Sequence, residues 1–366
     1  MCPPLKRVFL MAALVLTGCQ SASVLNHAQH SHFIGLSDFS KFSRTETTNG
    51  GVVLLSPEIE SPVEWDQLVL SWNASLPAGT TLEVEARSWP PEGVTKFYSM
   101  GRWSLADKPI PRTSVSGQKD RAGDVQADTL MLNRPATTVQ LRLTARSANN
   151  ASPTLKFLGI SFCDTKSATV MRPPHRAAWG KIILTPERSQ QAYPGGRGWC
   201  SPTALAMVLA RWAEVLQRPE LNLSVPQVAL KVFDQGYNGT GNWAFNVAFA
   251  GSLPGMRAYV ARLDDVGELE DWISAGIPVI LSARWDWLQP GRPDDPDGHL
   301  VVCIGFTKNG DVVINDPATN LKTETVRRIY KRENVICAWA ASHNTVYLVY
   351  PEGTATPVDR FGHWAK

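Results

Sequence analysis

The sequence lacks the features that mark two large classes of protein. It contains no long run of lysine or arginine, and its formal net charge is only +3. Proteins that bind nucleic acid usually carry a strongly basic surface, so we expect no nucleic-acid partner. Beyond the N-terminal segment there is no stretch of about 18 apolar residues, the length that a membrane-spanning helix needs. The sequence therefore predicts no membrane-spanning helix.

Cysteines are also few, and their spacing excludes two common uses. Cys2 and Cys19 lie in the N-terminal segment. The others are Cys163, Cys200, Cys303 and Cys337. They include no Cys-x-x-Cys pair, the spacing that zinc sites use, and a chain of 366 residues needs no disulfide framework. The sequence thus implies neither a metal nor a cofactor, and it leaves open whether Cys303 and Cys337 are bridged.

The N-terminal segment has the pattern of an export signal. Lys6 and Arg7 precede an apolar run over 8–16, which is too short to span a bilayer. The run ends in Leu-Thr-Gly-Cys at Cys19, which resembles a bacterial lipobox, where cleavage removes residues 1–18 and lipid is attached to the cysteine. Loss of the signal would leave a net charge of +1. An ordinary secretory signal with an incidental cysteine is the alternative.

This resemblance implies an exported protein whose membrane partner is reached through a lipid on Cys19. Gln20 rather than aspartate follows the cysteine, which by analogy indicates the periplasmic side of the outer membrane. Residues 19–32 are polar with scattered histidine, as expected of a tether.

Residues 33–163 carry short β-type patterns separated by turn residues. Examples are 67–72, 81–86, 139–144 and 155–160. Apolar and polar residues alternate in each, so one face of every strand is buried. Their spacing favours an all-β antiparallel sandwich. The segment contains no acid–base cluster, and binding of a glycan or of a protein are the roles that we consider for it.

The rest of the chain mixes helical and strand patterns, after a proline-containing linker over 164–180. In the second domain, 181–352, helices are predicted after Ser201, over 225–235 and over 263–275. Strands are predicted at 182–184, 278–282, 300–306, 311–314 and 345–350. Helices first and strands after them are typical of an α+β domain. The polar tail 353–366 is expected to be frayed.

A thiol lies directly before the first of these helices. Trp199-Cys200 is followed by Ser201, which we predict as the N-cap, and by Pro202 at the first helical position. The N–H groups and partial positive charge of a helix N-terminus favour the thiolate, which is the nucleophilic form. Packing of the cysteine as a small buried hydrophobe is the alternative.

His299 and Asp316 are candidates for a base and for the group that orients it. His299 stands at the start of a predicted strand, beside the Asp- and Pro-rich residues 293–297, where it can take the proton of a thiol. Asp316 ends the following strand and would hold the imidazole in one tautomer and orientation. The alternatives are a solvated loop histidine and an ordinary strand-ending turn.

The distance between these two residues is a difficulty. Asn309-Gly310 predicts a two-residue hairpin turn, and that register places Asp316 opposite Cys303, on the same face as His299. The offset along the strand is then about 13 Å, which is too long for a hydrogen bond. Either the loop is longer, or strand curl and a bulge close the gap.

The order of these segments resembles that of one peptidase family. Cys-Ser-Pro-Thr runs into an apolar helix, and Gly-His-Leu and a hairpin ending in Asn-Asp-Pro-Ala follow. This combination, over about 181–352, is similar to the papain-like cysteine peptidases that process bacteriocins with double-glycine leaders. The resemblance implies a papain-like fold and a catalytic trio of Cys200, His299 and Asp316. It also implies that Gln190 contributes to the oxyanion hole, with Gln191 as the alternative.

The chain departs from the transporter members of that family. It has no phosphate-binding Gly-x-x-x-x-Gly-Lys loop, and Ser201 stands where many papain-like enzymes carry glycine, which leaves leader-peptide specificity open.

Three functions are compatible with these features. The first is an envelope-anchored cysteine peptidase that forms an acyl-enzyme on a peptide or protein, with Trp199, Trp243 and Trp285 either walling the substrate groove or packing in the core. The second is an amidase or endopeptidase that uses the same trio on peptidoglycan stem peptides. The third is a binding lipoprotein with a relic peptidase domain, against which the presence of the whole trio argues.

Overall fold

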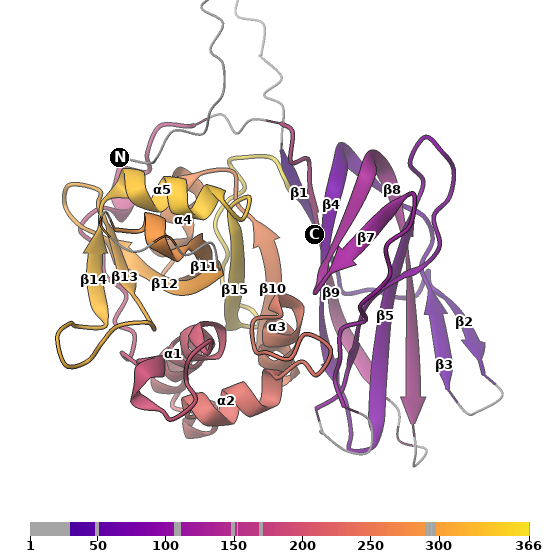
Figure 1. The fold of residues 1–366 in the computed structure, drawn as a ribbon, viewed down its shortest axis with the longest axis horizontal. Coiled ribbons are helices and arrows are strands. Elements are labelled where there is room, and N and C mark those ends of the chain that lie inside the picture. Colours follow the sequence, from indigo (N-terminus) through magenta and orange to yellow (C-terminus); the bar gives the residue numbers. More distant parts are fainter. Residues whose placement is uncertain are drawn as a thin grey trace, which may run out of the picture.

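The computed structural model has two domains that lie side by side (Figure 1). It describes residues 30–47, 51–105, 111–147, 151, 153–167, 171–289, 291, 294 and 298–365. The predicted signal, the lipid site at Cys19, most of the predicted tether and most of the loop 293–297 lie outside the described residues. Within the described ranges, no helix has the length and apolar character to cross a membrane.

The first domain is built of strands. They are β1 (Ser31–Leu36), β2 (Ser43–Glu46), β3 (Val52–Leu55), β4 (Ile59–Ser75), β5 (Thr80–Ser88), β6 (Tyr98–Trp103), β7 (Gly123–Gln126), β8 (Thr129–Ser147) and β9 (Thr154–Cys163). They form one antiparallel sheet, to which β16 (Trp364–Ala365) adds in parallel beside β1. The four predicted strands lie within β4, β5, β8 and β9 and are confirmed.

Two long strands hold this sheet together and bend it over an aromatic core. β8 pairs with β4 and β7 along its first part and with β3 and β5 along its last part. Bulges interrupt the register of β4 on both sides of Trp65, and bulges of this kind let a strand turn from one layer to another. The side chains of Trp65, Trp72 and Trp103 are fully buried in the resulting core.

The second domain combines helices with an antiparallel sheet. Its helices are α1 (Cys200–Leu216), α2 (Val225–Val232), α3 (Trp243–Ser252), α4 (Val266–Ser274) and α5 (Arg332–Ala340). Its strands are β10 (Met256–Arg262), β11 (Val279–Arg284), β12 (Gly298–Phe306), β13 (Val312–Asn315), β14 (Arg327–Tyr330) and β15 (Thr345–Pro351). Their order in the sheet is β10-β15-β11-β12-β13-β14. Mixed helices and strands agree with the predicted α+β class.

Some predicted boundaries are wrong. α1 begins at Cys200 with Trp199 as its N-cap, and not after a Ser201 cap. Residues 182–184 form no strand but a single bridge from Ile182 to Gly305. The hydrophobic pattern also does not predict α3, because nearly all of its side chains are buried and no polar face marks a helical period.

Helix α3 and strand β10 join the two domains. Both contact β4 of the first domain, and α3 also packs against β10 (Figure 1). Phe245 on α3 contacts the rings of Trp72 and Trp103, at centroid distances of 6.2 and 5.3 Å. Asn73 donates to the carbonyl oxygen of Ala258 and accepts from its N–H, at 2.6 and 3.1 Å. The apolar core is therefore continuous from one domain to the other.

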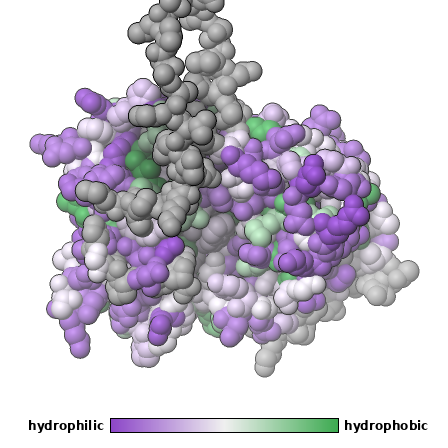
Figure 2. Space-filling model, turned by 45° about the horizontal axis from the view of Figure 1, so that its top comes forward, coloured by the Kyte–Doolittle hydropathy of each residue, from purple (hydrophilic) through white to green (hydrophobic). Residues whose placement is uncertain are grey.

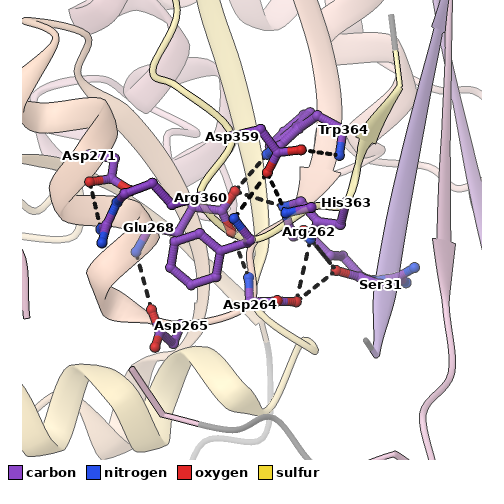
Figure 3. Close-up of polar contacts among 12 residues, drawn as sticks. Ser31, Arg262, Asp264, Asp265, Glu268, Asp271, Asp359, Arg360, His363 and Trp364 are labelled. Atoms are coloured by element: carbon purple, nitrogen blue, oxygen red, sulfur yellow. Dashed lines mark hydrogen bonds and ion pairs between the residues drawn. The ribbon is translucent and has the colours of Figure 1, made fainter. Parts of the chain in front are cut away.

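The C-terminal tail is ordered, which corrects the expectation that it is frayed. β16 adds to β1, and the preceding His363 is 1% exposed. The Nε2 atom of His363 donates to the carboxylate of Glu268 at 2.7 Å, and its Nδ1 atom lies 3.2 Å from the hydroxyl oxygen of Ser31 (Figure 3). The predicted tether also extends too far, because His30 and the start of β1 are already buried against Asp264. One end of the described chain thus contacts Asp264, just before α4, and the other end contacts Glu268 within α4.

The face of the molecule seen in Figure 2 is mostly hydrophilic, and its apolar residues form small, separate patches.

Candidate active site

The approach to Cys200 is a series of tight turns. Gly195 and Gly198 have φ angles of +78° and +82°, which glycine adopts without strain. A Cβ atom on Gly196 would lie 1.9 Å from the carbonyl oxygen of Gln190, so this position admits only glycine without a shift of the backbone. The N–H of Trp199 then donates to the carbonyl oxygen of Gly196 at 3.0 Å. The glycines bring the chain sharply into α1.

Helix α1 places the thiol at its first residue. Its N-terminal N–H groups have no partner within the helix, and the N–H of Ser201 donates to the Cys200 sulfur. The Ser201 hydroxyl lies 2.9 Å from the hydroxyl of Tyr347 on β15, which fixes the start of the helix on the sheet. Cys200 itself is partly exposed.

His299 lies on β12 next to this helix start. It stands opposite Ala283 of β11 and is 5% exposed. Its Nε2 atom bonds to Oδ1 of Asp316 at 2.7 Å, which leaves the other ring nitrogen for the Cys200 sulfur, to which the imidazole is also hydrogen-bonded. The structure therefore brings Cys200, His299 and Asp316 together in one line of contacts.

The contact between His299 and Asp316 depends on two departures from the expected hairpin. The loop has three residues rather than two, because Thr307 N–H bonds to Asp311 and Gly310 has a φ of +85°. A bulge between Cys303 and Gly305 shifts the register further, so that Val302 faces Asn315. Asp316 then comes opposite Val301, two residues from His299, and the side chains close the remaining gap. The simple register was wrong, and the longer loop and the bulge are both present.

Asp316 is held as a buried carboxylate. It is 1% exposed, accepts from the hydroxyl of Tyr330 at 2.6 Å and from the N–H of Ala318 at 2.9 Å. Burial alone would raise its pKa, but the charge and hydrogen bond of His299 and the bonds from Tyr330 and Ala318 hold the pKa well below its usual range. Tyr330 belongs to β14 and has no motif in the sequence that assigns it this contact.

The electrostatics favour a thiolate–imidazolium pair. Burial lowers the pKa of His299, yet the charge and hydrogen bond of Asp316, with the bond to Cys200, raise that pKa to about 10. Burial likewise raises the pKa of Cys200, but the hydrogen bond and charge of His299 and the N–H groups of Leu300 and Ser201 lower it below its ordinary value.

The other described free thiols are in different environments. Burial raises the pKa of Cys163 to about 11 and that of Cys303 to about 12. Cys303 is free, so it forms no bridge with Cys337.

Gln190 is 6% exposed and lies in a short 3-10 helix, Gln190–Ala192. Its N–H donates at 2.9 Å to the carbonyl oxygen of Pro317, the residue after Asp316. Its side-chain oxygen has no hydrogen-bond partner among the described residues. This backbone hydrogen bond links Gln190 to the loop that carries Asp316.

A groove with a volume of about 900 Å³ opens beside Cys200. One wall is the loop from Tyr237 to Gly241 together with Trp243. Of the tryptophans expected at a groove, only Trp243 lines this one; Trp285 packs edge-on to the His299 ring and Trp199 against Tyr193.

The first domain contributes a second wall of the groove, which sequence patterns do not predict. The groove-lining residues of this domain are Gln67, Gln126, Ala127, Asp128, Thr129 and Met131. Asp128 fastens the wall to the second domain by accepting the N–H groups of Trp243 and Ala244 at the start of α3. Because these residues lie far from Cys200 in sequence, only the packing of the two domains reveals them.

In the part of the chain that the structure describes, no group of three or more His, Cys, Asp or Glu side chains is arranged to hold a metal ion.

A thiol at the start of a buried helix, a histidine on the adjacent sheet and a carboxylate behind it are the arrangement of the papain-like cysteine peptidases. Comparison with known families agrees. Residues 182–347 match the Peptidase C39-like family, and residues 29–163 match the Peptidase C39 N-terminal domain. The chain belongs to the C39-like peptidase family, and its peptidase domain is of the cysteine type.

Solved structures show weaker resemblances. A C39-like peptidase from Bacillus anthracis shares 16% identity over 50% of this chain and 98% of its own, with a TM-score of 0.31. A xylan-binding module, CBM15, shares 15% identity over 38% of this chain and 94% of its own, with a TM-score of 0.18. Scores this low support no argument about function. No curated protein matches the chain.

Proposed function

We propose that the protein is an envelope-anchored cysteine peptidase that cleaves peptide bonds with Cys200, His299 and Asp316. The observation that supports this most directly is the continuous line of hydrogen bonds from the Cys200 sulfur through His299 to the buried Asp316. Lipid attachment at Cys19 would hold the enzyme at the membrane, on the periplasmic side of an outer membrane.

The chemistry follows from the charges on the pair. The Cys200 thiolate attacks the peptide carbonyl carbon, and the resulting oxyanion accepts hydrogen bonds from the Cys200 N–H and the Gln190 side-chain amide. His299 gives its proton to the leaving nitrogen, the C–N bond breaks, and a thioester remains on Cys200. His299 then takes a proton from water, whose oxygen attacks the thioester and releases the acid and the thiolate. Asp316 keeps the imidazole oriented throughout.

Thiol reactivity tests the pair directly. We expect iodoacetamide to alkylate Cys200 at pH 6 much faster than a model thiol, because only the thiolate reacts and the pKa of Cys200 is lowered. His299→Ala should abolish this reactivity, whereas His175→Ala, which removes a histidine bound to Asp271, should leave it unchanged. Peptide mapping should find Cys163 and Cys303 unlabelled at this pH.

Two results would contradict the proposal. One is a Cys200 that reacts only as fast as a model thiol, and the other is a Cys200 recovered in a disulfide.

The substrate class requires a separate comparison. Casein-derived peptides and purified muropeptides should be digested in parallel by the full chain. Cleavage of the casein-derived peptides supports a general peptidase, whereas release of stem peptides alone would show that the enzyme acts on the cell wall.

A further inference from the structure

Arg262, the last residue of β10, is a buried cation without a carboxylate partner. Its side chain is 3% exposed and lines the groove beside Cys200. Nη2 donates to the side-chain oxygen of Gln67 at 2.8 Å, while Nε and Nη1 have no hydrogen-bond partner among the described residues. Buried arginines are normally paired with an acidic group, because an uncompensated buried charge is costly.

The neighbouring carboxylates are engaged elsewhere. Asp66 accepts from the N–H and the hydroxyl of Thr165, at 2.9 and 2.7 Å. Asp264 lies 3.1 Å from His30 and also accepts from Ser31. Neither forms an ion pair with Arg262 among the described residues. The positive charge of Arg262 in the groove is therefore not balanced by any carboxylate of the described residues.

The sheet defines how far this position lies from the nucleophile. Leu300, whose N–H bonds to the Cys200 sulfur, stands opposite Ser282 of β11. Leu281 stands opposite Val346 of β15, and continuing this register by one residue brings Ser282 level with Thr345, which stands opposite Arg262 of β10. Three strand spacings of about 4.8 Å separate Leu300 from Arg262, or about 14 Å. An extended peptide covers this distance with about four residues.

Among the described residues that line the groove, the other charged side chains have partners. The Asp128 carboxylate is held at the start of α3, and Arg284 pairs with Asp286 and Asp294. Burial, followed by the charge of Arg262, lowers the pKa of His343 to about 4, so that this neighbour is neutral at neutral pH. The far end of the groove is therefore positive through Arg262.

We infer that this end of the groove is a carboxylate-binding subsite, in which Arg262 pairs with an acidic group of the substrate about four residues from the scissile bond. The inference rests on the proposed peptidase function. Gln67 now offers Arg262 a neutral oxygen, and a substrate carboxylate would displace it and form stronger, charge-assisted hydrogen bonds. The acidic group is a glutamate side chain or the C-terminal carboxylate of the peptide.

Quenched fluorescent peptides test the subsite on the full chain. A set in which one glutamate is moved through the four positions on each side of the cleaved bond should be compared with the same set carrying glutamine. At one position we expect glutamate to be preferred by about 10- to 100-fold in kcat/KM, the gain from hydrogen bonds to a charged group. Peptides with free and amidated C-termini separate a side chain from a chain end as the source of the carboxylate.

Three variants assign the preference to Arg262. Arg262→Gln should reduce cleavage of the glutamate peptide to the glutamine level while Cys200 alkylation is unchanged. Gln67→Glu places a carboxylate of the same shape beside Arg262, and it should remove the preference in a fully folded protein. Arg257→Gln is the matched control, because Arg257 also lies on β10 but lines a different cavity, and the preference should persist.

The outcomes distinguish the subsite from the proposed function. Cleavage without a glutamate preference at any position overturns the subsite but not the proposed peptidase function. A preference that survives both Arg262→Gln and Gln67→Glu has the same consequence. If no peptide is cleaved, binding is measured by calorimetry with Cys200→Ala. Tighter binding of the glutamate peptide that is lost with Arg262→Gln then supports the subsite, and equal binding of both peptides overturns it.

Discussion

The role of Asp316 at the residue scale comes from its charge as much as from its position. Both of its oxygens are occupied, one by His299 and Ala318 and the other by Tyr330. A buried carboxylate held in this way keeps the imidazole charged, and the charged imidazole in turn keeps Cys200 ionised. Asp316 therefore favours the ionised form of Cys200 by acting through His299.

Asp316→Asn should separate charge from shape. Without the negative charge the pKa of His299 falls and that of Cys200 rises, so we expect alkylation of Cys200 at pH 6 to slow by about tenfold or more. Tyr330→Phe removes one hydrogen bond but keeps the charge, and its effect should be several times smaller. The measurement is the pH profile of the alkylation rate, and equal effects of the two substitutions would argue against an electrostatic role for Asp316.

The hairpin of β12 and β13 decides the geometry at the scale of elements. Its bulge lies where residues 181–183 run antiparallel beside the strand: the Phe306 N–H donates to the carbonyl oxygen of Lys181, and the Ile183 N–H donates to that of Ile304. A Cβ atom on Gly305 would lie 2.1 Å from the Lys181 carbonyl oxygen. Glycine at this position thus permits the close approach of residues 181–183 to the bulge, whose register brings Asp316 to His299.

Gly305→Ala should therefore disturb both stability and the site. The added methyl group forces residues 181–183 or the bulge to move, at a cost of about 1–3 kcal/mol in the free energy of unfolding. We expect a lower melting temperature and slower alkylation of Cys200. Gly298→Ala, at the other end of β12 where a Cβ meets nothing within 4 Å, should leave the melting temperature unchanged. Equal melting temperatures for the two variants would show that residues 181–183 leave room for a Cβ atom at Gly305.

The whole molecule is held as one body by contacts that involve both ends of the described chain. His363 of the tail, Ser31 of β1 and Glu268 of α4 meet in a buried cluster (Figure 3). Burial lowers the pKa of His363, but the charges and hydrogen bonds of Glu268 and Asp264 raise it to about 10. The folded protein therefore keeps a proton on His363 that the unfolded chain releases near pH 6.5.

This difference predicts a loss of stability as pH rises from 7 to 8. The contribution of protonated His363 to the free energy of unfolding is fully present below pH 6.5, and it declines as the pH rises towards 10. His299 acts in the same direction, whereas Cys200 acts in the opposite one because its folded pKa is lowered. The contribution of His363 to the slope should be about 1.4 kcal/mol per pH unit, the value for one proton.

His363→Gln should flatten this slope in denaturant unfolding measured at each pH, while His175→Ala should keep it. A slope that is unchanged in His363→Gln would show that the proton is bound elsewhere.

The sequence by itself determined the features that depend on local chemistry. Alternation in strands, the apolar pattern after Cys200 and the turn at Gly310 act over a few residues, so the main elements and the three candidate residues were predictable. The order of the segments also predicted the peptidase family that the comparisons support. The exact start of α1 was not predictable, because Trp199 caps it without a side-chain bond.

Only the tertiary structure decided the contacts between distant segments. The bulge between Cys303 and Gly305 lies beside residues 181–183, which are distant in sequence. Helix α3 forms although its burial hides any amphipathic period, and the tail is ordered because it pairs with β1 and contacts α4. The groove is shared between domains, so Gln67 and Asp128 gain their places only when the two sheets pack on α3. Such contacts arise from packing over long sequence separations, which no local pattern encodes.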